Sequence, residues 1–151
     1  HHLIARDELA SHPGKPVGLW AYEALRIEAG RPRIGIDTDD RTIPNEAGLL
    51  GGAVHMDKGC YRGQETVARV HNLGRPPRRL VFLHLDGSGH VLPDAGAPVL
   101  LGDREVGRLT TVARHHEDGP VALAVIKRSV PEDVELLVGT TSASQTVVVS
   151  G

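Results

Sequence analysis

The chain has 151 residues, of which 24% are charged, and a formal net charge of −2. This length can bury a core in one domain or in two small ones, and the near balance of charge gives no reason to expect nucleic acid or an anionic membrane as a partner. No apolar run reaches the roughly 20 residues that cross a bilayer, no signal peptide is visible, and the single cysteine excludes an internal disulfide. We therefore expect a cytoplasmic protein without a membrane partner.

The first half of the chain is predicted to contain two helices among turns. A helix is expected over residues 17–29, ended by Gly30 and Pro32. Glu28 extends the apolar stripe of that helix, whose members are Trp20, Ala21, Ala24 and Ile27. The other expected elements are a strand end and loop over 1–15, turns over 31–52, a short strand over 53–56, and a helix over 64–73 closed by Gly74.

The second half is predicted to be a small antiparallel barrel. After the breaker Arg75-Pro76-Pro77-Arg78, six short apolar runs follow with turns and no helix between them. They cover residues 80–85, 97–101, 105–115, 121–127, 134–138 and 146–149. In the fourth run Val121, Leu123 and Val125 alternate with smaller residues, as in a half-buried strand.

The only cysteine lies just before the predicted second helix, in the segment Lys58-Gly59-Cys60-Tyr61-Arg62-Gly63-Gln64-Glu65. A neighbouring cation or a helix N-terminus favours the nucleophilic thiolate. Cys60 is therefore a candidate nucleophile, with Lys58 and Arg62 as candidate activating groups. The alternative is a small buried residue that happens to be cysteine, and both interpretations stay open.

Other polar residues are expected to have structural roles. Glu28, if buried, would need a partner such as Arg26. The acidic run at 37–40 is expected to be a solvated turn, and His115 and His116 are expected at the surface, without a zinc-binding pattern. A basic cluster could hold a phosphate or form a solvated interdomain seam; its members are Arg69, His71, Arg75, Arg78 and Arg79.

Three blocks in the expected order resemble the YgfZ/GcvT folate-binding family. The block at 58–65, with Arg69, resembles the YgfZ branch; the block at 24–32 is shared with the glycine-cleavage T-protein, an aminomethyltransferase; the third is at 43–49. The resemblance implies an α+β fold. Residues 1–74 would be the tail of a ferredoxin-like folate-binding region, residues 75–151 a C-terminal Greek-key β-barrel, and an N-terminal half would be absent here.

The resemblance also implies tetrahydrofolate as cofactor, bound mainly with the missing half. Arg26 and Glu28 would hold the pterin or shape its pocket, because a carboxylate can accept two hydrogen bonds from an aminopyrimidinone edge. Cys60, with Lys58 and Arg62, would carry the chemistry. Further folate contacts are expected from Tyr61, Gln64, Glu65 and Arg69.

The implied function is that of a folate-binding accessory protein for iron–sulfur cluster assembly or repair, with iron–sulfur proteins as clients and an indirect link to tRNA. One cysteine cannot hold a stable cluster, which takes four ligands, and no metal site is expected. Two alternatives stay open: a folate-dependent aminomethyltransferase of one-carbon metabolism, and a non-catalytic module that docks protein or RNA. Whether the protein is an enzyme therefore stays open as well.

Overall fold

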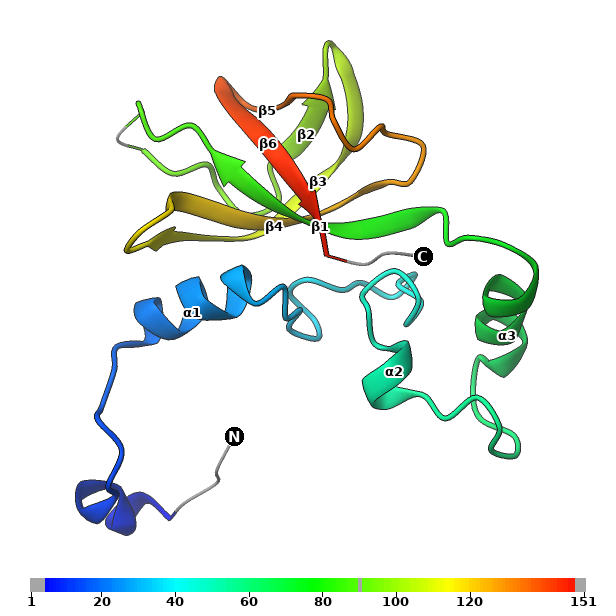
Figure 1. The fold of residues 1–151 in the computed structure, drawn as a ribbon, viewed down its shortest axis with the longest axis horizontal. Helices are drawn as coiled ribbons and strands as arrows, with labels where there is room; N and C mark the ends of the chain where they lie inside the picture. The colour runs from blue at the N-terminus through cyan, green and yellow to red at the C-terminus, as the bar shows by residue number, and fades with distance from the viewer. Residues whose placement is uncertain (1–4, 90, 149–151) are drawn as a thin grey trace.

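The computed structural model describes residues 5–89 and 91–148, and all of their side chains except that of Leu73. The helices are η1 (Arg6–Ser11, a 3-10 helix), α1 (Leu19–Glu28), α2 (Leu50–Ala53) and α3 (Gln64–Leu73). The strands are β1 (Arg78–Leu85), β2 (Pro98–Leu101), β3 (Arg104–His115), β4 (Gly119–Lys127), β5 (Leu136–Val138) and β6 (Thr141–Val147). Figure 1 shows the strands gathered into one body, with the helical segments along one side of it.

The strands form a closed antiparallel barrel in the order β1-β4-β3-β2-β5-β6, with β6 pairing back to β1. The predicted α+β fold class with a small barrel is confirmed, and all six predicted strands are present. The last strand begins at Thr141 rather than at residue 146, and the predicted end of that strand at 149 lies outside the described residues.

The strand β4 is buried on both faces, so the prediction of a half-buried strand is wrong. Ala122, Ala124 and Ile126 point into the barrel, where they pack with residues such as Val81, Leu83 and Leu109. The alternate residues Val121, Leu123 and Val125 form a second apolar cluster outside the barrel, together with Ala24 and Ile27 of α1. Three branched residues of the strand therefore pack with α1 outside the barrel, while two small alanines and Ile126 pack inside it.

The helix α1 confirms the helix predicted over 17–29 but not its apolar stripe. Ala24, Arg26 and Ile27 are buried against the barrel, whereas Trp20 is 88% exposed. The stripe was defined by apolar residues alone. A buried arginine takes part in the real contact face, because it finds charged and hydroxyl partners there.

The remaining segments correct two more predictions. Residues 6–11 form a 3-10 helix and not a loop, and the predicted strand end at 1–4 lies outside the described residues. Ala53 ends α2 where a strand was predicted. The helix α3 begins and ends where the sequence predicts, after Gly63, which has a φ of +82° that only glycine adopts readily.

Candidate functional site

The structure does not bring the two groups of predicted site residues together. Arg26 and Glu28 lie on α1 against the barrel, while the segment around Cys60 leads into α3. Figure 1 shows α1 and α3 at opposite ends of the helical side, with α2 between them. Any site that uses both groups would therefore need further chain or a partner to join them.

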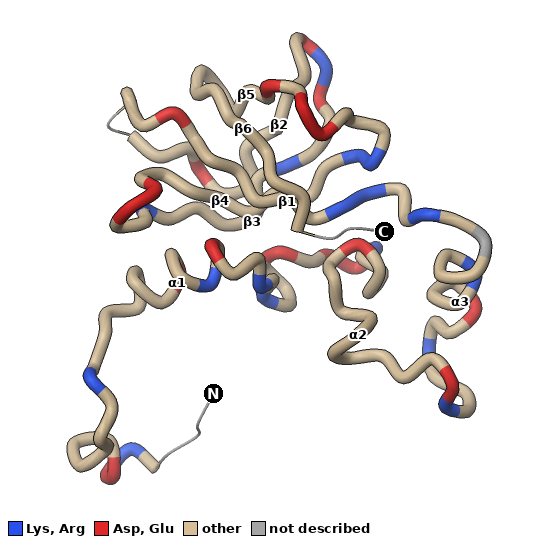
Figure 2. The backbone as a smooth tube through the Cα atoms, viewed as in Figure 1, with Lys and Arg blue, Asp and Glu red and all other residues tan. Residues whose placement is uncertain are grey.

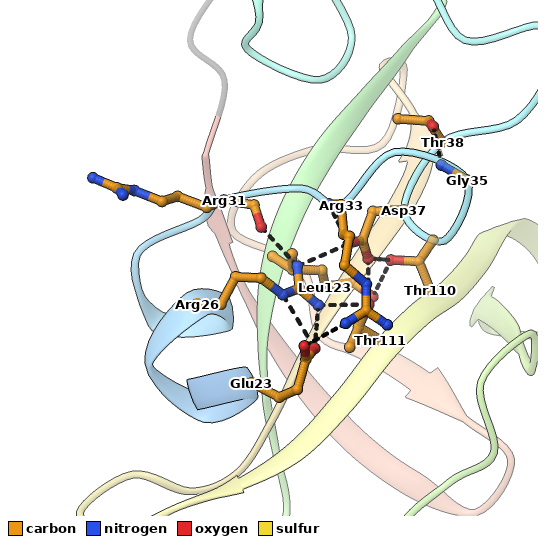
Figure 3. Close-up of polar contacts among 10 residues, drawn as sticks. All are labelled: Glu23, Arg26, Arg31, Arg33, Gly35, Asp37, Thr38, Thr110, Thr111 and Leu123. Atoms are coloured by element: carbon orange, nitrogen blue, oxygen red, sulfur yellow. Dashed lines mark hydrogen bonds and ion pairs between the residues drawn. The ribbon is translucent and has the colours of Figure 1, made fainter. Parts of the chain in front are cut away.

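Asp37 is the centre of a buried polar network that joins the loop after α1 to the barrel (Figure 3). Its Oδ2 accepts hydrogen bonds from Arg26 Nη1 and from the backbone N–H of Arg33, both at 2.8 Å. Its Oδ1 accepts hydrogen bonds from the hydroxyls of Thr110 and Thr111. A carboxylate offers about four acceptor sites, so this buried charge is fully satisfied.

A β-bulge lets both threonines reach Asp37. Successive side chains of a strand normally point to opposite faces, but the pairing of β3 with β4 shifts register between Leu109 and Thr111. Such a bulge sets two residues against one partner and redirects a side chain. Arg26 was already a predicted site residue and the two adjacent threonines were a further signal in the sequence, but nothing marked Asp37 as buried.

Arg26 uses its whole guanidinium inside this network. Nε and Nη2 both donate to Glu23 Oε2, at 3.1 and 2.7 Å. Nη1 donates to the Arg31 carbonyl and to Asp37. Nη2 also donates to the hydroxyl of Thr111. Burial alone would lower the pKa of Arg26, but Glu23 and Asp37 outweigh it and raise that pKa. Arginine has five N–H donors and all five are engaged. Of the two predicted roles of Arg26, shaping a pocket therefore suits the geometry better than holding a pterin.

A second ion-pair network fixes the end of the same loop to β1. Arg78 Nη2 lies 2.8 Å from Glu46 Oε2, and Arg78 Nη1 lies 2.9 Å from Asp39 Oδ2. The Leu80 N–H also donates to the Glu46 carbonyl at 2.9 Å. The hydrogen bonds from Arg78 and Thr42 hold the pKa of Asp39 well below its usual range, and the bonds of Arg78 to Asp39 and Glu46 raise the pKa of Arg78. Figure 2 shows the acidic positions of the loop close to the basic start of β1.

The acidic run at 37–40 is thus not a solvated turn. Asp37 is fully buried and Asp39 half-buried, while Asp40 is exposed as expected. The run differs from a solvated turn because the barrel supplies partners for two of its residues. Two threonine hydroxyls of β3 donate to Asp37, and Arg78 of β1 donates to Asp39.

The predicted basic cluster at 69–79 does not form one surface. Arg69 pairs with Glu65 at 3.0 Å within α3, and Arg78 faces the acidic loop. Arg79 is buried and donates to the Val130 carbonyl at 2.9 Å, and burial lowers the pKa of its guanidinium. Successive residues of β1 point to opposite sides, so adjacent arginines at its start cannot face one phosphate.

Glu28 lies at the end of α1 beside an open cavity of about 400 Å³, whose other lining includes Phe82, His84 and Asp118. Its side chain is 51% exposed, so it is not the buried residue that the stripe predicted. The Glu28 Oε2 lies 3.4 Å from Nε2 of His115. His115 is buried, which corrects its predicted place at the surface.

Cys60 is exposed, as are Lys58 and Arg62 on either side of it. Tyr61 and Gln64 are half-buried, and the hydroxyl of Tyr61 is buried without a hydrogen-bond partner in the described part of the chain. The alternative of a small buried cysteine is therefore wrong. The sulfur is open to a partner, and the roles of its neighbours stay predictions.

Two negative findings apply to the part of the chain that the structure describes. Within residues 5–89 and 91–148, no helix has both the length and the apolar character needed to cross a membrane. Over the same residues, no three His, Cys, Asp or Glu side chains lie where they could share a metal ion.

Comparison with curated proteins finds similar sequences that include aminomethyltransferases and YgfZ proteins, although no family model matches the chain. An aminomethyltransferase of Symbiobacterium thermophilum is 40% identical over 97 residues, which is 64% of this chain and 25% of the relative. A tRNA-modifying protein YgfZ of Edwardsiella ictaluri is 35% identical over 127 residues, 81% of this chain and 38% of the relative. An Escherichia coli YgfZ is 39% identical over 107 residues, 68% and 32% of the two chains.

A solved structure has the same fold. It is the glycine cleavage system aminomethyltransferase T of Bartonella henselae, with a TM-score of 0.69 and 29% sequence identity, covering 87% of this chain and 37% of that one. The predicted resemblance is confirmed by these relatives. The chain spans between 25% and 38% of the length of the curated relatives described above.

Proposed function

We propose, from the premise that this chain is a relative of the aminomethyltransferases and the YgfZ proteins, that it is a folate-binding accessory protein for iron–sulfur enzymes. In this proposal Cys60 is the reactive thiol and tetrahydrofolate is the bound cofactor. When bound, the folate would supply a one-carbon unit or its redox chemistry. The chain matches only 25% to 38% of the length of its relatives. The proposal therefore concerns this chain acting together with the further segments that those relatives contain.

The observation that carries the proposal is the exposure of Cys60 between two exposed cations. A thiol sealed in the core could not meet a client protein, whereas this one lies on a segment ahead of α3 where a partner can reach it. Lys58 and Arg62 are the proposed catalytic partners of Cys60, since both are exposed beside it in the sequence.

The fit of a folate rests on Glu28. Its half-exposed carboxylate borders the cavity with Phe82, and a carboxylate can accept two N–H donors from an aminopyrimidinone. The Asp37 network would fix the end of α1 from which Glu28 projects, because Arg26 lies two residues before it. Contacts of Tyr61, Gln64, Glu65 and Arg69 with folate remain part of the proposal.

The test is a Cys60→Ala variant of the full chain in a strain that lacks the protein. We expect normal accumulation of the variant but no restoration of iron–sulfur enzyme activity. The matched control is Thr66→Ala, an exposed change on the same segment, which should restore activity fully. Full restoration by Cys60→Ala would reject the role of the thiol.

A second function, folate-dependent aminomethyl transfer, is favoured by the 40% identity to one aminomethyltransferase and by the fold of another. It predicts transfer that depends on methylene-tetrahydrofolate and survives Cys60→Ala. Absence of turnover with any amine donor would argue against it.

Docking to RNA, suggested by the names of the YgfZ relatives, has less support, because two arginines of the predicted basic cluster face internal partners. Strongly salt-dependent RNA binding would restore it.

A further inference from the structure

One nitrogen of the buried His115 imidazole finds no hydrogen-bond partner within residues 5–89 and 91–148. The side chain is 2% exposed at the end of β3. Its Nδ1 accepts hydrogen bonds from the backbone N–H groups of Glu117 and Asp118 at 3.3 and 3.1 Å. Its Nε2 has no hydrogen-bond partner and lies 3.4 Å from the Glu28 carboxylate. A buried polar atom without a partner is costly, so this arrangement calls for an explanation.

The hydrogen bonds at Nδ1 determine what Nε2 carries. A neutral imidazole has one protonated nitrogen, and because Nδ1 accepts hydrogen bonds the proton belongs on Nε2. A doubly protonated ring, with the Asp118 carboxylate 3.4 Å from Nδ1, also has a proton on Nε2. In both states Nε2 therefore carries a proton, and the Glu28 carboxylate 3.4 Å away is an acceptor within reach of it.

Glu28 needs such a group. It is the last residue of α1, where the helix dipole disfavours a negative charge. Its half-exposed side chain is free to adopt several rotamers, and ordering it on binding a ligand would cost affinity. A fixed hydrogen-bond donor beside the carboxylate would offset part of the unfavourable interaction with the helix dipole and part of the cost of ordering the side chain.

We propose that His115 is a positioning residue for Glu28: a small movement of the half-exposed Glu28 side chain, whose Oε2 lies 3.4 Å from Nε2, lets the Nε2–H donate to the carboxylate and hold it toward the cavity that includes Phe82 and Asp118. One of the four acceptor sites of the carboxylate is then used from behind, and the rest remain for adjacent N–H donors of a ligand. This inference rests on the proposed binding of folate at Glu28. His115 itself cannot touch the ligand, because its Nε2 is buried.

Two substitutions separate positioning from support of the fold. His115→Asn places an amide oxygen near Nδ1, so it keeps the acceptor for the two backbone N–H groups and loses the donor to Glu28. His115→Gln places an amide nitrogen near Nε2, so it keeps the donor. The probe is 5-formyltetrahydrofolate, titrated calorimetrically into the full-length protein that contains this chain and into each variant of it.

We expect His115→Asn to weaken binding about tenfold and His115→Gln to stay within about threefold of the wild type, while Glu28→Gln weakens binding at least as much as His115→Asn. Wild-type affinity in His115→Asn, or equal losses in both His115 variants, would overturn the inference and leave the proposed function standing.

A second measurement keeps the two proposals apart and does not depend on any variant of His115. Long-range proton–nitrogen spectra of the histidine rings should show a His115 ring with a protonated Nε2, whose resonance shifts in Glu28→Gln. If the wild type binds no folate, the proposed function fails, and the inference is judged on these spectra alone. An Nε2 resonance that Glu28→Gln leaves unchanged would then overturn it.

Discussion

Two segments of the helical side differ in how they are held to the barrel. The loop at 31–47 buries Asp37 and Glu46 against the strands through charge-assisted hydrogen bonds. The segment at 54–74 exposes most of its residues, including Cys60, and its Glu65–Arg69 ion pair stays within α3. The residues that resemble a solvated turn thus hold the fold, and the residues with a chemical signature contribute little to it. We infer that the segment at 54–74 contributes little to the stability of the barrel and is available to bind a partner.

The largest effect should come from Asp37→Asn. Asparagine has one acceptor oxygen where the carboxylate has two, so one side of the network faces N–H donors in place of an acceptor, and the buried Arg26 loses one of its two counter-charges. We expect the free energy of unfolding to fall by about 4 kcal/mol. Urea denaturation followed by circular dichroism measures it, with Asp40→Asn, an exposed neighbour, as control. Equal stability of the two variants would break the comparison between the segments.

The next effect tests the apolar part of the same contact. Ile27 is fully buried between α1 and the outer face of the barrel, whereas Leu25 on the same helix is 48% exposed. Ile27→Ala should reduce the free energy of unfolding by about 3 kcal/mol, through lost burial and the cavity that remains. Leu25→Ala should cost less than 1 kcal/mol. Similar losses in the two variants, measured by the same urea titration, would mean that α1 is not anchored by this face.

The sequence predicted elements well where local pattern decides them. Alternating apolar runs and turn residues predicted all six strands, and Gly63 and Gly74 bracketed α3. The predictions from sequence failed where the burial of a side chain depends on a partner far along the chain. Asp37 is buried because a bulge more than 70 residues later supplies two hydroxyls, and Trp20 is exposed although it belongs to the predicted apolar stripe. Periodicity cannot reveal such pairings, and the sequence therefore predicted the barrel better than the site.

A smaller effect depends on pH. The hydrogen bonds of Arg78 hold the pKa of Asp39 well below its ordinary value of 3.8. A carboxyl whose folded-state pKa is depressed contributes stability above its unfolded pKa and loses it as the pH falls. We expect the wild type to exceed Asp39→Asn by about 1 kcal/mol at pH 7, and this difference to shrink below about pH 4.

The measurement for Asp39 is the free energy of unfolding by urea at several pH values between 7 and 3. Asp57→Asn, an exposed change in the segment around Cys60, should stay within about 0.5 kcal/mol of the wild type throughout. A difference between wild type and Asp39→Asn that does not change with pH would show that Asp39 acts through shape and not through charge. The loop at 31–47 would then be held by Asp37 and Glu46 without its third acid.

The smallest effect concerns the exposed segment itself. Glu65 and Arg69 are one helical turn apart on α3, with side chains 87% and 68% exposed. Such pairs stabilise a helix by about 0.3 kcal/mol, so Glu65→Gln should leave the urea midpoint nearly unchanged. Amide hydrogen exchange is the sharper readout, because it reports local opening: exchange in α3 should rise by less than about twofold, with no change in β4. Accelerated exchange in β4 would mean that α3 supports the barrel after all, and the segment with Cys60 would then have a structural role besides its proposed chemical one.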